Sequence, residues 1–515
     1  MTAVLHTWRR SYTFVCLATV LIVAAADFFF YGHKVGWTAA AMVAAMFCLL
    51  SARDTRFYGT VVGRAFTLGL IGLLFALVEQ PTWLNATYAL LCLSGMALIN
   101  TMGPESDFVP WLGRWTRWLS LGWTRFFLDN SVAMRWLMRR GFSPAVARTV
   151  AAWTVPVLLS LVFVGIFAWA NPIIDNWISA LGHQIAEVLK KLPSLLDIPR
   201  MFFWLAFAVA AWMLLRGRVW RRHRRAPPNS QRPFDAIVIE NEFSISAALV
   251  IRCLILFNIV FAVENILDLS VLYSEHTPTG TEYKTYVRRG AYPLVAAALL
   301  AGTFVLVTFR PDSDTEKSPA ARHLVYVWVG QTILLTGSAI WRLHRYIDLT
   351  ELTRLRVASA VWFLLVALGL FYIVWRIVKS RSNAWLINAN ALTALLVIYP
   401  CCFINFDGYI ADFNAEHCRE AGGPGSAIDL DYFRDLGPSA LAALDRTRGK
   451  LTVRPRAEHA AEVSRDLHAQ LNEELADWRS WTWRRQRAQR EVEAVAAAKG
   501  VQERDLASAG PTIAH

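Results

Sequence analysis

The sequence predicts an all-α, polytopic helical membrane bundle of about eleven transmembrane helices, followed by a small helical extracytoplasmic C-terminal tail. Apolar stretches of membrane-spanning length recur through most of the 515 residues. Composition agrees, because 55% of the residues are hydrophobic and only 18% are charged, below the roughly 25% typical of soluble domains. The core of a single soluble domain could not bury so much apolar surface.

Each predicted span is an apolar run near the roughly 20 residues that a helix needs to cross a bilayer core about 30 Å thick. Helices are expected because backbone polar groups in lipid must be hydrogen-bonded within their own segment. Two of the runs, at residues 36–52 and 201–215, are short. The predicted spans are residues 12–30, 36–52, 58–78, 83–100, 151–169, 201–215, 244–273, 291–309, 324–341, 357–378 and 384–406.

A connection rich in Trp and Arg separates the fourth span from the fifth. Pro104, Glu105 and Asp107 open it, and residues 111–148 predict one or two amphipathic helices lying on a membrane face. The predicted organisation is four N-terminal spans at 1–100, a cytoplasmic amphipathic connection at 101–150, a seven-helix transmembrane core at 151–406 and a soluble helical tail at 407–515.

Lys and Arg set the predicted orientation in the membrane. With a cytoplasmic N-terminus, the inner loops hold about twice as many of these residues as the outer loops when the C-terminal tail is left out, in agreement with the positive-inside rule for short loops. The densest cluster, residues 216–225, then follows the sixth span on the inner side. An odd span count places the tail outside, which in a bacterial inner membrane is the periplasm. The net charge of +13 therefore indicates topology and attraction to anionic lipid, with no nucleic-acid partner.

From Asp407 onward the composition resembles that of a soluble protein. Residues 429–444 place a Gly-Pro break between two short amphipathic helices, and residues 457–499 are rich in helix-forming residues and paired charges. Three tryptophans in the second stretch are expected either to cover a small helical core or to touch the membrane surface. They are Trp478, Trp481 and Trp483.

The seven cysteines form no metal or redox pattern, and the sequence contains no CxxC, HExxH, GxxxxGK[ST] or GxSxG motif. We therefore expect no catalytic residue, no metal and no cofactor, and an enzyme is the least favoured class. One disulfide between Cys418 and either Cys401 or Cys402 stays open, because all three lie near the predicted outer face.

Ionisable residues inside spans are costly unless they are paired or reach water, and are therefore candidates for function. Asp27, near the outer end of the first span, is expected to reach water. On the seventh span, Asn258, Glu264, Asn265 and Asp268 fall within an arc of about 120°. This polar face either forms an ion pathway or makes interhelical hydrogen bonds that fix packing. The candidate cationic partners at the ends of the following spans are Arg288, Arg289 and Arg342.

The outer connection between the ninth and tenth spans, residues 341–356, breaks the positive-inside trend, so a structural or binding role must outweigh it. Pairing with nearby carboxylates would be sufficient. The arginines concerned are Arg342, Arg345, Arg354 and Arg356, and the candidate carboxylates are Glu264, Asp268, Asp348 and Glu351.

Several motifs in this half of the chain resemble one family. They are residues 265–273 (NILDLSVLY), 283–294 (YKTYVRRGAYPL), 298–300 (ALL), 342–356 with Leu352, Thr353 and Arg354, and the pair Asn388 and Asn390 ahead of Asn405, Asp407 and Asn414. The family is a group of uncharacterised bacterial inner-membrane proteins catalogued as a domain of unknown function. The resemblance covers approximately residues 151–444 and implies a polytopic membrane protein without supplying an activity. Glu264 departs from it, because the family leads us to expect an amide there.

We expect a non-enzymatic sensor or an envelope assembly partner, whose tail and outer loops meet another envelope protein beside the lipid bilayer. The alternative is a transporter or channel that uses the polar face of the seventh span. An inverted repeat or a pair of broken helices would favour transport, and neither is visible in the sequence.

The predicted topology has a direct test. Because the inner loops carry the excess of Lys and Arg, a reporter fused after Lys450 should be active only if it is of the kind that works outside the cytoplasm. Paired fusions to a periplasmic and a cytoplasmic reporter measure this. Activity of the cytoplasmic reporter alone would refute the odd span count.

Overall fold

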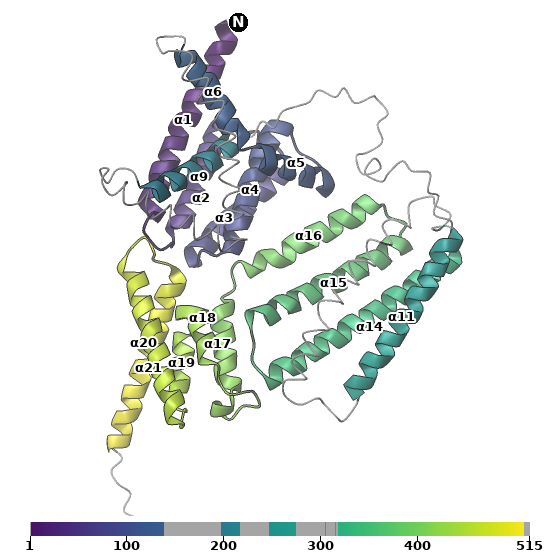
Figure 1. The fold of residues 1–515 in the computed structure, drawn as a ribbon, viewed down its shortest axis with the longest axis vertical. Helices are drawn as coiled ribbons and strands as arrows, with labels where there is room; N and C mark the ends of the chain where they lie inside the picture. The colour runs from purple at the N-terminus through teal and green to yellow at the C-terminus, as the bar shows by residue number, and fades with distance from the viewer. Residues whose placement is uncertain are drawn as a thin grey trace, which may run out of the picture. The chain divides into compact units, whose positions relative to one another are not determined.

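The computed structural model describes residues 2–138, 197–216, 247–273 and 318–508, together with Phe304 and Thr315. Within these residues every regular element is a helix (Figure 1), so the predicted all-α class is confirmed for the part described. Residues 151–169 and, except for Phe304, residues 291–309 lie outside it, as do Arg288 and Arg289.

Seven of the described helices are long and apolar enough to cross a membrane. The predicted spans at 36–52 and 201–215 correspond to shorter apolar helices, Thr38–Arg53 and Pro199–Leu215. The chain is therefore an integral membrane protein with several apolar helices. The seven are Tyr12–Phe30, Val61–Glu79, Trp83–Met102, Ala248–Ser270, Pro319–Asp348, Arg354–Val378 and Asn383–Cys401.

The helices divide into two compact units. The first takes in Met1–Leu74, Ala89–Pro104 and Leu112–Arg224, and the second takes in Phe75–Tyr88, Glu105–Trp111 and Arg225–His515. The helices that begin in the N-terminal part are α1 (Thr2–Phe30), α2 (Thr38–Arg53), η1 (Arg56–Gly59), α3 (Val61–Glu79), α4 (Trp83–Met102), α5 (Phe108–Leu121), α6 (Thr124–Met138) and α9 (Ile198–Leu215).

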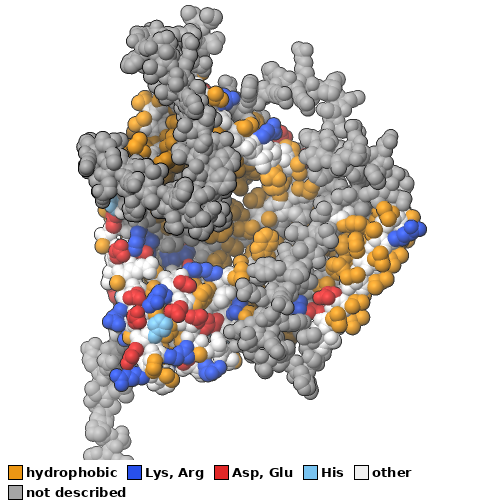
Figure 2. Space-filling model, in the orientation of Figure 1, with side chains coloured by type: hydrophobic (Ala, Val, Ile, Leu, Met, Phe, Trp, Pro, Cys, Tyr) orange, Lys and Arg blue, Asp and Glu red, His pale blue; other side chains and the backbone are white. Residues whose placement is uncertain are grey.

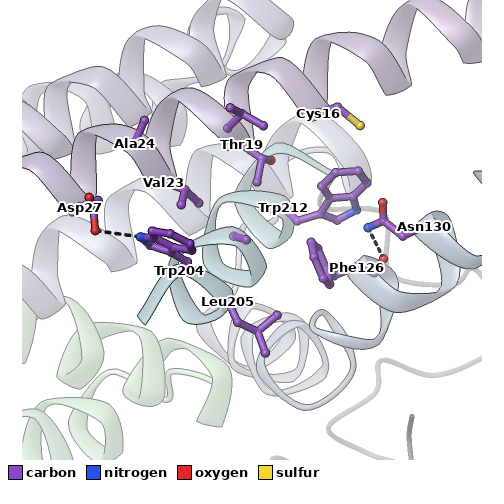
Figure 3. Close-up of a pocket in the computed structure, with 12 residues that line it drawn as sticks. Cys16, Thr19, Val23, Ala24, Asp27, Phe126, Asn130, Trp204, Leu205 and Trp212 are labelled. Carbon is purple, nitrogen blue, oxygen red and sulfur yellow. Dashed lines mark hydrogen bonds between the residues drawn. The ribbon is translucent and has the colours of Figure 1, made fainter. Parts of the chain in front are cut away.

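In the first unit, α1 packs against α2 and α9, and α6 packs against α9. Polar contacts join α1 to α9 near the C-terminal end of α1. Asp27, which we expected to reach water, is 20% exposed and also forms an ion pair with Arg200, whose Nη2 lies 2.5 Å from Oδ2 of Asp27. The Trp204 indole also donates to Asp27. A groove remains between α1, α6 and α9 (Figure 3).

The second unit contains the remaining helices. Its four apolar helices α11, α14, α15 and α16 each pack against the next one in this order. Its elements are α11 (Ala247–Tyr273), α14 (Pro319–Leu349), α15 (Arg354–Val378), α16 (Asn383–Cys401), α17 (Phe406–His417), η2 (Arg419–Ala421), α18 (Leu430–Leu436), η3 (Gly437–Ala440), α19 (Leu441–Arg448), α20 (Arg454–Ala476) and α21 (Trp483–Ser508).

Local sequence explains where three of these helices begin. The side chains of Ser318, Thr353 and Ser382 each accept a hydrogen bond from a backbone N–H in the first turn of α14, α15 and α16. A short polar residue at this position satisfies an amide that has no partner inside the helix.

The surface of α11 is covered with hydrophobic side chains, whereas the C-terminal helices expose mixed acidic and basic ones (Figure 2).

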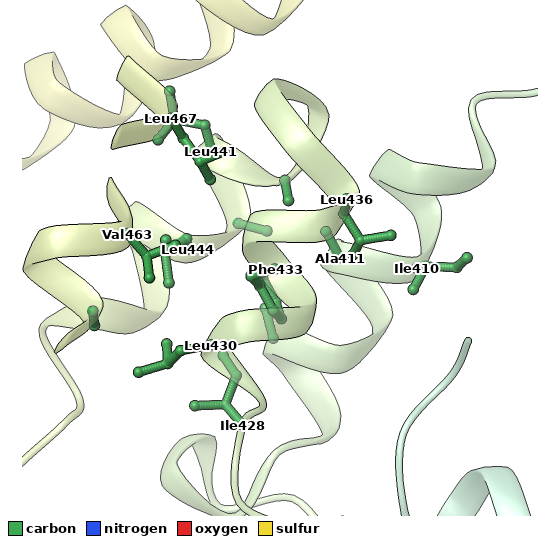
Figure 4. Close-up of a cluster of buried hydrophobic side chains, with 14 of the residues drawn as sticks. Ile410, Ala411, Ile428, Leu430, Phe433, Leu436, Leu441, Leu444, Val463 and Leu467 are labelled. Carbon is green, nitrogen blue, oxygen red and sulfur yellow. The ribbon is translucent and has the colours of Figure 1, made fainter. Parts of the chain in front are cut away.

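The helices from α17 onward share a core of their own, here called the C-terminal domain (residues 406–508). Phe433, Leu441 and Leu444 are fully buried in it and meet Val463 and Leu467 of α20 (Figure 4). Burying an aliphatic or aromatic side chain of this size contributes roughly 1.5–3 kcal/mol. This core explains why a segment with few long apolar runs still folds.

The predicted break in residues 429–444 is present, because α18 ends at Leu436 and Gly437 and Pro438 open the 3-10 helix η3. Gly437 adopts a φ of 75°, a region that side-chain-bearing residues rarely enter. Trp478 and Trp483 each stay 49% exposed, so these two do not cover the core. Cys401, Cys402 and Cys418 are free thiols, so the disulfide left open by the sequence is not formed.

Candidate functional site

The polar face of α11 packs against α14. The Asn258 side-chain amide donates to the Leu324 carbonyl at 3.0 Å, and the Asn265 amide donates to the Gln331 carbonyl at 3.3 Å. Each amide also donates to the carbonyl four residues earlier on its own helix. The donors are seven residues apart, as are their acceptors, so the same bridge recurs after about two helical turns.

Asp268 lies at the end of this series and is 5% exposed. Its Oδ1 is 2.6 Å from Nη1 of Arg342, and its other oxygen accepts from the Ser338 hydroxyl. Ser338 and Arg342 are one turn apart on α14, so they approach the carboxylate from the same face. Of the three cationic partners considered from sequence, the structure brings Arg342 to Asp268, and Arg288 and Arg289 are outside the described residues.

Glu264 is not part of this contact. It is exposed, although it lies one turn from Asp268. The reason is geometric, because Glu264 lies at the outer edge of the predicted arc, about 100° around the helix from Asn265. Three of the four polar residues of α11 therefore face α14, and the fourth does not.

The short loop that follows α14 is held by α17. The Asn414 side chain accepts from the Leu352 N–H at 2.7 Å and donates to the Leu352 carbonyl at 2.9 Å. Both residues are buried, so one amide satisfies two backbone groups that would otherwise have no partner. An ionised carboxylate could not do this, since it has no N–H or O–H to donate. We call this contact, together with the pairs described next, the loop clamp.

Two arginines complete the loop clamp. Arg354 Nε lies 2.6 Å from Oδ1 of Asp407, and the Arg354 guanidinium also donates to the Asp435 carbonyl. The Arg356 guanidinium lies 4.1 Å from the centroid of the Tyr346 ring, a favourable cation–π contact. Arg342 thus has one of the carboxylate partners expected from sequence, whereas Arg354 pairs with a carboxylate outside that set.

Glu351, in the same loop as Leu352, is a titratable group next to the loop clamp. Its Oε1 accepts from the Asp429 N–H at 2.9 Å. Burial raises the pKa of the Glu351 carboxyl to about 7, with the charges of Asp429 and Glu420 adding to the rise, while the hydrogen bond from Asp429 and the charge of Arg356 oppose it. Glu351 therefore changes charge near neutral pH.

Three further contacts within the second unit involve the ends of α3 and α5. At the turn after α3, Glu79 pairs with Arg487 at 3.0 Å, and Gln80 accepts from the Thr482 hydroxyl at 3.0 Å. Before α5, the Asn388 side chain accepts from the Phe108 N–H at 2.8 Å. The C-terminal domain thus contacts both the α3–α4 turn and the α14–α15 loop.

In the sequence, Asn414 and Asp407 are recognisable only as motif residues, and no role is predicted for them. Their partners, Leu352 and Arg354, are more than fifty residues earlier in the chain. The available signal was weak, namely amide and carboxylate side chains just after the last apolar run. Among the residues described, no three His, Cys, Asp or Glu side chains group closely enough to hold a metal ion.

A family model described as a domain of unknown function, DUF4153, matches residues 65–447. The match includes every motif on which the resemblance rests, so the expected relationship is confirmed. It also starts further toward the N-terminus than expected, in α3 instead of at residue 151. No curated protein and no solved structure matches the chain.

The Asp268–Arg342 pair predicts the order in which substitutions lower the free energy of unfolding. Asp268→Leu strands the Arg342 charge and should cost about 3–5 kcal/mol, whereas Asp268→Leu combined with Arg342→Met should recover most of that loss. Asp268→Asn keeps a hydrogen-bonding group and should be tolerated better than Asp268→Leu by about 1–3 kcal/mol. Thermal unfolding in detergent measures the order. Glu264→Gln is the matched control, and equal melting of all variants would mean that Asp268 is not packed.

Glu351 predicts a pH dependence. The native state holds the Glu351 proton more tightly than the unfolded chain, so stability is highest below the unfolded pKa of 4.5 and falls as the pH rises through about 7. Glu351→Gln keeps an acceptor for the Asp429 N–H and should flatten this part of the melting profile between pH 5 and about 8. Glu491→Gln, on the exposed surface of α21, should leave the profile unchanged. Identical profiles for both variants would contradict the assignment.

Proposed function

Since the chain belongs to the DUF4153 family, whose description assigns no function, we propose from its contacts that it is a non-enzymatic sensor or envelope assembly partner. It would act in a bacterial inner membrane, with the C-terminal domain as the part that meets an envelope protein. The single observation that carries this proposal is the loop clamp, which joins that domain to the end of α14.

The loop clamp connects the C-terminal domain to α14 through a short segment of chain. Asn414 fixes the loop directly after α14, and Arg342 lies about two turns before the end of the same helix. A partner that prefers one position of the C-terminal domain would therefore bias the position of α14, because the loop between them is short and its backbone is hydrogen-bonded. A ligand shifts such an equilibrium only through contacts that differ between the two states.

The contacts also support the proposed topology of about eleven spans with a periplasmic C-terminal domain. In that topology the α3–α4 turn, the α14–α15 loop and residues 407–515 all lie on the outer side. Glu79 and Leu352, one from each connection, contact the C-terminal domain. An even number of spans between them would be needed for any membrane arrangement that keeps these contacts.

A transporter or channel is the second candidate, and one observation favours it. Three polar atoms at the α11–α14 contact are buried and without a hydrogen-bond partner in the part of the chain described: Asn258 Oδ1, Trp328 Nε1 and Gln331 Oε1. Water or an ion could satisfy them. The Asp268–Arg342 pair weighs against this, because its two charges neutralise each other and are both largely buried.

Complementation of a deletion strain separates the two candidates. Asn414→Ala removes two buried hydrogen bonds, at a cost of roughly 2–4 kcal/mol, and Arg354→Gln removes the ion pair at the edge of the clamp. The sensor proposal expects both to lose complementation while the protein still accumulates in the membrane. It expects Asp268→Asn combined with Arg342→Gln, which removes the charges and keeps the hydrogen-bonding groups, to complement.

The matched control is Asn472→Ala, an exposed asparagine of α20 outside the clamp, which should behave as the parent. The reverse pattern would overturn the sensor proposal and favour transport. In that pattern Asn414→Ala and Arg354→Gln complement, whereas Asp268→Asn combined with Arg342→Gln does not.

A further inference from the structure

We propose that the groove between α1, α6 and α9 binds one glycerophospholipid of the surrounding bilayer, with an acyl chain in the groove and the phosphate on Arg200. The groove has a volume of about 600 Å³ and is lined by twelve residues of these three helices (Figure 3). This is a separate inference from the proposed function, because it concerns the first unit alone.

The dimensions fit one acyl chain. On α1, the lining runs from Cys16 to Asp27, a rise of about 16 Å. One leaflet of the hydrocarbon core is about 15 Å deep, half of the full thickness. A single lipid chain therefore matches the length of the groove, whereas a folded protein segment would have to satisfy its own backbone groups inside it.

The walls are apolar and the rim opens toward lipid. Val23 and Ala24 face Leu205 and Ala208 across the groove. At its rim Val20 is 65% exposed, although it belongs to a helix long and apolar enough to span the membrane. Hydrocarbon is the medium around such a helix, so a lipid chain can enter sideways without leaving the bilayer.

The polar end supplies the headgroup contact. Arg200 uses Nε and Nη2 to bind Asp27, which leaves Nη1 for another acceptor, and the Arg200 side chain is 42% exposed. The guanidinium lies 5.5 Å from the Trp204 ring and 5.1 Å from the Tyr31 ring. Trp and Tyr favour the membrane–water boundary, and a guanidinium N–H is a strong donor to phosphate oxygens.

The test uses the full-length protein in vesicles of phosphatidylethanolamine and phosphatidylglycerol that contain a trace of phospholipid with a photoactivatable acyl chain. Adducts are mapped by mass spectrometry. Labelling is expected on Val20, Val23 and Leu205. Ala208→Leu, which fills the groove, should lower this labelling by about fivefold, equivalent to about 1 kcal/mol. Ala24→Leu, from the opposite wall, should do the same.

The matched control is Ala206→Leu, which adds the same side chain to an exposed position of α9 outside the groove and should leave labelling unchanged. Labelling of Leu256 on α11 should be the same in all variants, which verifies insertion. Asp27→Asn combined with Arg200→Gln should lower labelling, and excess inorganic phosphate should not, because the site needs the acyl chain. Equal labelling in the parent and both groove-filling variants would overturn the proposal, as would labelling of the parent at Leu256 without labelling at Val20, Val23 and Leu205.

Discussion

Hydrogen bonding in a medium without water is the constraint on which the described structure depends. A polar group buried between apolar helices has no solvent to return to, so each one must find a partner within the protein. The side-chain N–H groups of Asn258 and Asn265 meet this requirement with carbonyl groups of α14, and Asp268 meets it with Arg342. These bonds fix the register of α11 against α14, because a slip of one residue would separate every pair.

The same constraint explains the loop clamp at the end of α14. The loop must reverse the chain between two apolar helices, and a reversal leaves backbone groups without helical partners. Asn414 satisfies two of them from a different domain. An ordinary packing requirement thereby connects the C-terminal domain to the ends of α14 and α15. Glu351 lies within this connection, so proton binding near neutral pH acts on the element that joins domain and membrane helix.

In the first unit, the Asp27–Arg200 pair meets the same constraint at the end of two helices. This ion pair lies close to tryptophan and tyrosine rings, and the space between the helices is apolar. The first unit also uses buried polar bridges away from the groove, because the Asn100 side chain accepts from the Phe57 N–H and donates to the Asp54 carbonyl. In both units, polar side chains that leave water are therefore hydrogen-bonded to a neighbouring segment.

The sequence by itself determined the helical class, the positions of the apolar helices described and the presence of a polar face on α11, because these follow from hydrophobicity and from a repeat of 3.6 residues. Both are local properties. Only the tertiary structure decided that Arg342 pairs with Asp268, that Glu264 stays exposed and that Asn414 holds Leu352. Those pairings join segments far apart in the chain, and nothing in local periodicity says which polar residue of one helix will meet which backbone group of another.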